Sequence, residues 1–193
     1  MNFQCETGFT LRGRSIPSTM LKKMDETSLS DDLSAKLEKD GYLLLRNVYD
    51  VNEVIEARRM ILKSLHEVGE VIEPYDSGIF SGDSNRRRIY PTTKDLGEFW
   101  KKTSEMEELR RVINGKNIMR VMNSIFEEEA SHFSFAWLRA MVKGKASPVH
   151  VDHPYMNRGT DKLVTCWTPL SEIAEDEGTL YVMSESHFWS DIR

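Results

Sequence analysis

The sequence predicts an α+β fold in which helices pack outside a β-sheet. The first two-thirds of the 193-residue chain carry apolar residues at helical spacing, with recognisable start and stop signals. The last third carries short segments rich in β-branched and aromatic residues, separated by turns. Residues 1–27 show little periodicity and are expected to form an N-terminal arm, whereas residues 28–193 are expected to form a single domain.

The first predicted helix begins after Ser30, which is expected to be its N-cap, and ends at Gly41. Asp31 and Asp32 fall in its first turn, where acidic side chains oppose the positive end of the helix dipole. A strand is expected to follow over residues 42–48, because the segment is apolar and lies between turn signals.

Asp50 is expected to cap a second helix that runs to Leu65. The predicted core-facing stripe of this helix consists of Val51, Val54, Ile55, Ile61, Leu62 and Leu65. Ser104 and Glu107 match a capping box at the start of a third helix. Apolar residues at helical spacing over 118–126 predict a fourth helix.

Three strands are predicted in the last third of the chain, over residues 137–142, 163–170 and 179–183. Gly-containing and polar segments between them are expected to be turns or loops. His150 and Asp152 lie between the first two of these strands.

His150 and Asp152 are two residues apart, so on an extended backbone their side chains point to the same side. An imidazole and a carboxylate in this arrangement are two of the three ligands of the 2-His-1-carboxylate triad, which is diagnostic of non-haem Fe(II) oxygenases. The alternative is a surface turn held by the aspartate side chain. Spacing alone does not separate the two interpretations, so the flanking strand pattern is needed to favour metal binding.

Composition excludes several other classes of function. The net charge of −5 argues against a nucleic-acid or anionic-membrane surface. Cys5 and Cys166 are too few and too far apart for a disulfide framework or a Cys-based zinc motif. There is no long apolar run of the kind needed for a signal peptide or a membrane span, so we expect a cytoplasmic protein. There is also no G-x-S-x-G, P-loop or H-E-x-x-H motif.

The order of these elements resembles the phytanoyl-CoA dioxygenase family of Fe(II)- and 2-oxoglutarate-dependent oxygenases. The resemblance covers about residues 30 to 188 and rests on residues 40–47, 138–140, 150–152, 155–160, 166–170 and 178–187. It implies a double-stranded β-helix, a cupin-like jelly roll, that holds Fe(II) and takes 2-oxoglutarate and O2 as co-substrates. The implied reaction is hydroxylation of a small organic or acyl substrate.

The resemblance also implies a distal His ligand and an Arg for the far carboxylate of 2-oxoglutarate, and the chain stops at Arg193 before either would appear. We therefore expect an incomplete, C-terminally truncated double-stranded β-helix that is inactive as this chain. The alternative function is that of a non-catalytic remnant or partner-binding half-barrel. Uncovered strand edges would favour self-association in either case.

Three further residues correspond to co-substrate positions of the family. Arg139 precedes the His150 motif and is expected to bind 2-oxoglutarate, although it would also suit a salt bridge across the sheet. Arg88 corresponds to a basic residue that reaches the co-substrate, although residues 86–88 would also suit a solvated basic turn. Trp167 corresponds to an aromatic residue beside 2-oxoglutarate, and its alternative is a place in the core.

The other four histidines are weaker ligand candidates. His153 would point to the opposite face from the pair if the backbone stays extended. His187 is the tempting third ligand, but the family carries a Ser/Thr-His there that does not bind iron. His66, near a helix end, is expected to be structural, and His132 has no evident partner.

Overall fold

The computed structural model describes residues 10–11, 14–15, 22–82, 96–141, 147, 149–156, 159–174 and 178–189. Its helices are α1 (Leu33–Asp40), α2 (Val51–Glu67), α3 (Leu96–Ser104), α4 (Glu107–Ile113), α5 (Lys116–Phe126) and α6 (His153–Met156), with 3-10 turns η2 (Tyr75–Ser77) and η3 (Ser186–Phe188). Its strands are β1 (Thr10–Leu11), β2 (Arg14–Ser15), β3 (Glu26–Thr27) and β4 (Leu44–Leu45). Strands β1 and β2 pair antiparallel, and β3 and β4 pair parallel. No helix in these ranges is both long and apolar enough to cross a membrane.

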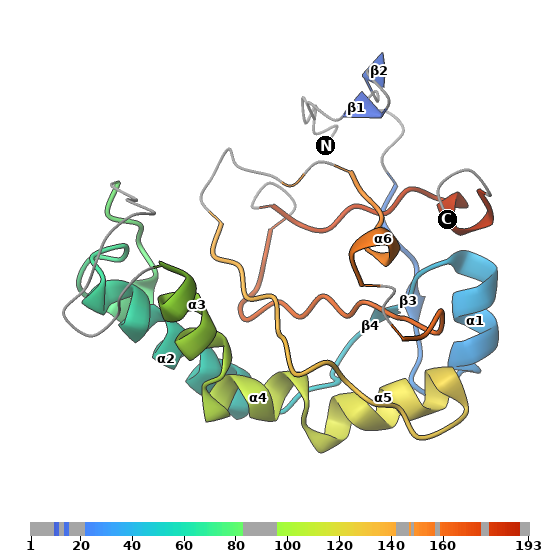
Figure 1. Ribbon diagram of the computed structural model, residues 1–193, viewed down its shortest axis with the longest axis horizontal. Helices are drawn as coiled ribbons and strands as arrows, with labels where there is room; N and C mark the ends of the chain where they lie inside the picture. Colours follow the sequence, from blue (N-terminus) through green and yellow to red (C-terminus); the bar gives the residue numbers. More distant parts are fainter. Residues whose placement is uncertain are drawn as a thin grey trace.

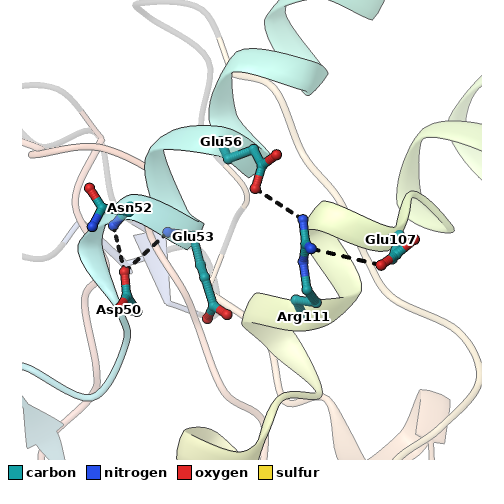
Figure 2. Close-up of polar contacts among 6 residues, drawn as sticks. All are labelled: Asp50, Asn52, Glu53, Glu56, Glu107 and Arg111. Atoms are coloured by element: carbon teal, nitrogen blue, oxygen red, sulfur yellow. Dashed lines mark hydrogen bonds and ion pairs between the residues drawn. The ribbon is translucent and has the colours of Figure 1, made fainter.

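The helix starts show which capping predictions hold. Asp32, and not the predicted Ser30, caps α1, because its carboxylate accepts a hydrogen bond from the Ala35 amide at 3.0 Å. Gly41 ends α1 as predicted, in the left-handed conformation at φ 76°. Asp50 caps α2 as predicted and accepts hydrogen bonds from the amides of residues 52 and 53 (Figure 2).

Helix α2 packs against α4, and Arg111 joins them at the surface. Its guanidinium lies 3.0 Å from the Glu56 carboxylate on α2 and 3.7 Å from Glu107 on its own helix (Figure 2). These ion pairs are exposed, so they contribute less than the buried side chains beneath them. The first core cluster contains Ile61, Leu65, Val68, Val71, Phe99 and Leu109.

The predicted stripe of α2 is wrong at its start. Val51 and Ile55 are 69% and 58% exposed. At about 100° per residue they lie about 80° and 120° around the helix from Ile61, which is in the core. Ala57 is buried instead, because a small side chain suits close helix packing.

The capping box predicted at Ser104 is also wrong. Ser104 ends α3, and its hydroxyl donates to the Lys101 carbonyl at 3.0 Å, so it is not available to cap the next helix. Helix α4 starts after Met106 without a side-chain cap. The predicted helix over 118–126 is confirmed as α5, whose buried face packs with Leu33 of α1 in the second core cluster, made of Leu33, Ile118, Val121 and Ile125.

The last third of the chain differs most from the prediction. The described parts of residues 137–142, 163–170 and 179–183 contain no strand, and the strand expected over 42–48 is reduced to β4. The described parts of the three C-terminal ranges are extended segments that cross between two groups of helices, α2 to α4 on one side and α1 with α5 on the other (Figure 1). Strand propensity reflects how side chains fit a pleated surface, whereas a strand also needs a hydrogen-bonded neighbour, which these segments do not have in the described residues.

The extended segments are nevertheless attached to the helices. Leu138 and Leu170 pack against the first core cluster, and Val164 packs against the second. The fold is therefore mixed, with many helical residues and little strand, and the described extended segments contact both core clusters. A closed barrel is not formed by the described residues, and the double-stranded β-helix stays a prediction.

Candidate metal site

His150 and Asp152 form the centre of the candidate site. The Nε2 atom of His150 lies 3.2 Å from Oδ1 of Asp152, and the two side chains are 38% and 28% exposed. Neither residue is in a helix, because α6 begins only at His153. The structure thus brings together the two side chains that the sequence singles out, at a surface that solvent can reach.

The pair is spaced as two ligands of one metal ion would be. Two atoms that lie about 2.1 Å from a metal and at right angles to each other are about 3.0 Å apart. The 3.2 Å separation of Nε2 and Oδ1 fits two neighbouring positions of an octahedral ion. An imidazole nitrogen and a carboxylate oxygen are also the donors that a non-haem iron site uses.

Thr165 holds the other oxygen of Asp152. Its hydroxyl donates a hydrogen bond to Oδ2 at 2.8 Å, across 13 residues of sequence. Asp152 also accepts, through its backbone carbonyl, a hydrogen bond of 2.9 Å from the Tyr155 amide at the start of α6. Sequence reasoning did not identify Thr165, and no local motif marks it, because the contact depends on how two distant segments lie together.

A hollow of about 300 Å³ adjoins His150 and is lined by Trp137, Arg139, Ser147, His150 and Tyr155. The guanidinium of Arg139 lies 4.1 Å from the centre of the Trp137 ring and donates to the Ser147 hydroxyl. In the part of the chain that the structure describes, no carboxylate pairs with Arg139, so the predicted alternative of a salt bridge across the sheet is not formed there. A cation is therefore exposed in the wall of the hollow.

Tyr49 attaches the segment that carries Thr165 to the helical part. Its hydroxyl lies 2.8 Å from Thr168 Oγ1 and 3.6 Å from Cys166 Sγ. Burial is the main cause that raises the pKa of Tyr49 well above its ordinary value, and the neighbouring Cys166 raises it further. Side chains 164, 166 and 168 thus face the helices, whereas Thr165 faces Asp152, as expected for an extended segment.

Trp167 is exposed, so the alternative prediction that it belongs to the core is wrong. Among the described residues that line the hollow, Trp167 is not included. Alternation along the segment would put it on the same side as Thr165. Arg88 and its neighbours Arg86 and Arg87 lie outside the described residues.

The remaining histidines lie elsewhere. His153 pairs with Asp161 at 3.4 Å, and the backbone does not stay extended there, because α6 starts at this residue. His66 contacts the Val71 carbonyl and Glu73 at 2.9 and 3.1 Å. His132 lies 3.2 Å from the Asn114 amide. His187 packs against Gly41, at the end of α1.

Among the described residues, no third protein ligand lies beside the pair. All five histidines lie in the described part of the chain, and that part contains no group of three or more His, Cys, Asp or Glu side chains that could hold a metal ion. His150 and Asp152 therefore fit two positions of an iron site, and the third must come from solvent or from outside the described residues.

Comparison with protein families relates the chain to a known family. The model of the family described as phytanoyl-CoA dioxygenase (PhyH) matches residues 37–193, which is most of the chain. No curated protein and no solved structure matches the chain.

Proposed function

Because the chain belongs to the phytanoyl-CoA dioxygenase family, we propose that it is an Fe(II)- and 2-oxoglutarate-dependent oxygenase whose iron is held by His150 and Asp152. The family implies oxygenase chemistry in general. The observation that carries the assignment to these residues is the 3.2 Å separation of Nε2 and Oδ1. Iron bound there would supply O2 activation coupled to the oxidative decarboxylation of 2-oxoglutarate to succinate and CO2.

The hollow beside His150 supports a role in binding 2-oxoglutarate. Arg139 is the cation in its wall, and a guanidinium binds a carboxylate through two parallel hydrogen bonds. The guanidinium lies over the Trp137 ring and donates a hydrogen bond to Ser147, and these two contacts restrict its orientation. Arg139 is thus oriented before a carboxylate arrives, which lowers the entropy cost of binding.

The aromatic residues of the hollow supply an apolar surface for the carbon chain of the co-substrate. Trp137 and Tyr155 line the hollow and would displace water from the carbon chain of a bound acid. We assign Trp167 the same role on the segment of Thr165, and Arg88 a second contact to the co-substrate. The last two roles rest on family resemblance alone.

The test is Fe(II)-dependent release of succinate from 2-oxoglutarate in air. With two protein ligands, we expect the 193-residue chain to release none above background, and a longer protein that carries the family's distal His to release it. His150→Ala in the longer protein should abolish release, whereas His153→Ala should not, because His153 pairs with Asp161 instead. Release that survives His150→Ala would overturn the assignment.

A second candidate function is binding to another protein copy. It is favoured by a row of exposed apolar side chains along one extended segment, namely Phe133, Phe135, Trp137 and Met141. Sedimentation velocity over a range of concentrations tests it. Self-association that Phe135→Ser weakens would support this candidate, and a monomer at all concentrations would exclude it.

A further inference from the structure

The two oxygens of Asp152 have different partners. Oδ1 lies 3.2 Å from Nε2 of His150, whereas Oδ2 accepts the Thr165 hydroxyl at 2.8 Å. An ionised carboxylate only accepts hydrogen bonds, so the threonine is the donor. The carboxylate is therefore held in one rotation, with Oδ1 toward the histidine.

The hydroxyl of Thr165 is itself held in place by the segment that carries it. Val164 packs into the second core cluster, and Thr168 lies 2.8 Å from the Tyr49 hydroxyl. Because neighbouring side chains of an extended segment point to opposite sides, anchoring residues 164 and 168 directs Thr165 toward Asp152. The partners that anchor this segment, the second core cluster and Tyr49, lie far from His150 and Asp152 in the sequence.

We propose that Thr165 is a positioning residue that makes Asp152 a one-oxygen metal ligand. This inference rests on the proposed function. With Oδ2 occupied by the hydroxyl, Oδ1 alone is presented beside Nε2, and the carboxylate takes one position on the metal. Binding through both oxygens would take a second position, one of the three that the facial arrangement leaves open for co-substrate and O2.

The experiment is an anaerobic titration of the full chain with Fe(II), and with Co(II) as a metal whose visible absorption depends on its coordination. Thr165→Val removes the hydroxyl at nearly constant shape, and Thr165→Ser keeps it. Thr160→Val is the matched control, since the Thr160 hydroxyl lies on the same segment but accepts a hydrogen bond from the Lys162 amide instead of donating to Asp152. Circular dichroism establishes that each variant is folded.

Loss of a hydrogen-bond partner of a metal ligand typically weakens metal affinity about 10- to 100-fold. Because the hydrogen bond from Thr165 is exposed, we expect a loss of about tenfold in Thr165→Val, with a changed Co(II) spectrum. Thr165→Ser and Thr160→Val should bind both metals with wild-type affinity and give the wild-type Co(II) spectrum.

Two outcomes separate this inference from the proposed function. If His150→Ala abolishes metal binding but Thr165→Val retains wild-type affinity and spectrum, Thr165 has no positioning role and the iron pair stands. If the wild-type chain binds no metal, or binds it equally well after His150→Ala, the proposed iron pair itself fails and the role of Thr165 fails with it.

Discussion

A Cβ atom placed on Gly41 would lie 2.2 Å from Nδ1 of His187. The imidazole therefore packs directly on the glycine that ends α1, and this contact joins the C-terminal segment to the first helix. Gly41 also has a φ of 76°, where any other residue is strained. Both the backbone conformation and the neighbouring ring require glycine here.

Gly41→Ala should destabilise the protein by about 2–4 kcal/mol, because backbone strain of about 1 kcal/mol adds to overpacking of about 1–3 kcal/mol. Gly82→Ala is the matched control, since Gly82 also has a positive φ, 84°, but no atom of the described residues within 4 Å of its Cβ position. It should lose only the strain component. Urea unfolding measures the stability loss of each glycine variant. Adding His187→Ala to Gly41→Ala should restore part of its loss. Equal losses in the two glycine variants would contradict the packing.

The partly buried Tyr49, with its raised pKa, predicts a loss of stability in alkali. Below pH 10 the phenol is protonated in both the folded and unfolded states, so its contribution is fully present. Above pH 10 the unfolded phenol ionises while the folded one, with its raised pKa, stays neutral, so stability falls until the folded pKa is reached. The slope from this group is at most about 1.4 kcal/mol per pH unit.

Urea unfolding between pH 8 and 11 checks this, with Tyr49→Phe beside wild type. The variant loses the hydrogen bond to Thr168 and should be less stable at pH 8, but its stability should fall less steeply above pH 10. Tyr42→Phe is the control, because the Tyr42 hydroxyl accepts an exposed hydrogen bond of 3.3 Å from the Asp25 amide. Parallel curves for wild type and Tyr49→Phe would show that Tyr49 titrates normally.

The Arg139 cation predicts weaker binding of 2-oxoglutarate when it is removed. Arg139→Ala should weaken the free energy of 2-oxoglutarate binding by about 1–2 kcal/mol, which is about five- to thirtyfold in affinity. This loss is smaller than for a buried charge, because the guanidinium is exposed. Calorimetric titration with 2-oxoglutarate in the presence of Mn(II) measures it. Arg110→Ala is the control, since Arg110 donates to the Ser134 carbonyl at 2.7 Å and does not line the hollow. Unchanged affinity in Arg139→Ala would remove this residue from the site.

Local signals in the sequence were enough to predict most of the helices. Asp50 caps α2 and Gly41 ends α1 because capping depends on a few neighbouring residues. The predictions failed where the outcome depends on distant partners. Val51 fits an apolar stripe but faces solvent, and residues 163–170 have strand propensity without a strand partner in the described residues.

In the candidate site, too, contacts between near neighbours in the sequence were predictable and contacts between distant residues were not. The proximity of the His150 and Asp152 side chains was predictable, because a two-residue spacing on an extended backbone brings them to one side. The Thr165 hydroxyl and the packing of His187 on Gly41 were not, since each joins residues far apart in the sequence. The stacking of Arg139 on Trp137 follows from a two-residue spacing and was open to prediction from the alternation of side chains.

Iron binding by His150 and Asp152 is tested most directly by anaerobic equilibrium dialysis of the chain against Fe(II). We expect wild type to bind weakly, since two protein ligands hold the ion less tightly than three. His150→Ala and Asp152→Ala should each weaken binding at least about tenfold, whereas His153→Ala, next to the pair but bonded to Asp161, should leave it unchanged. Equal affinity in wild type, His150→Ala and Asp152→Ala would contradict the iron site.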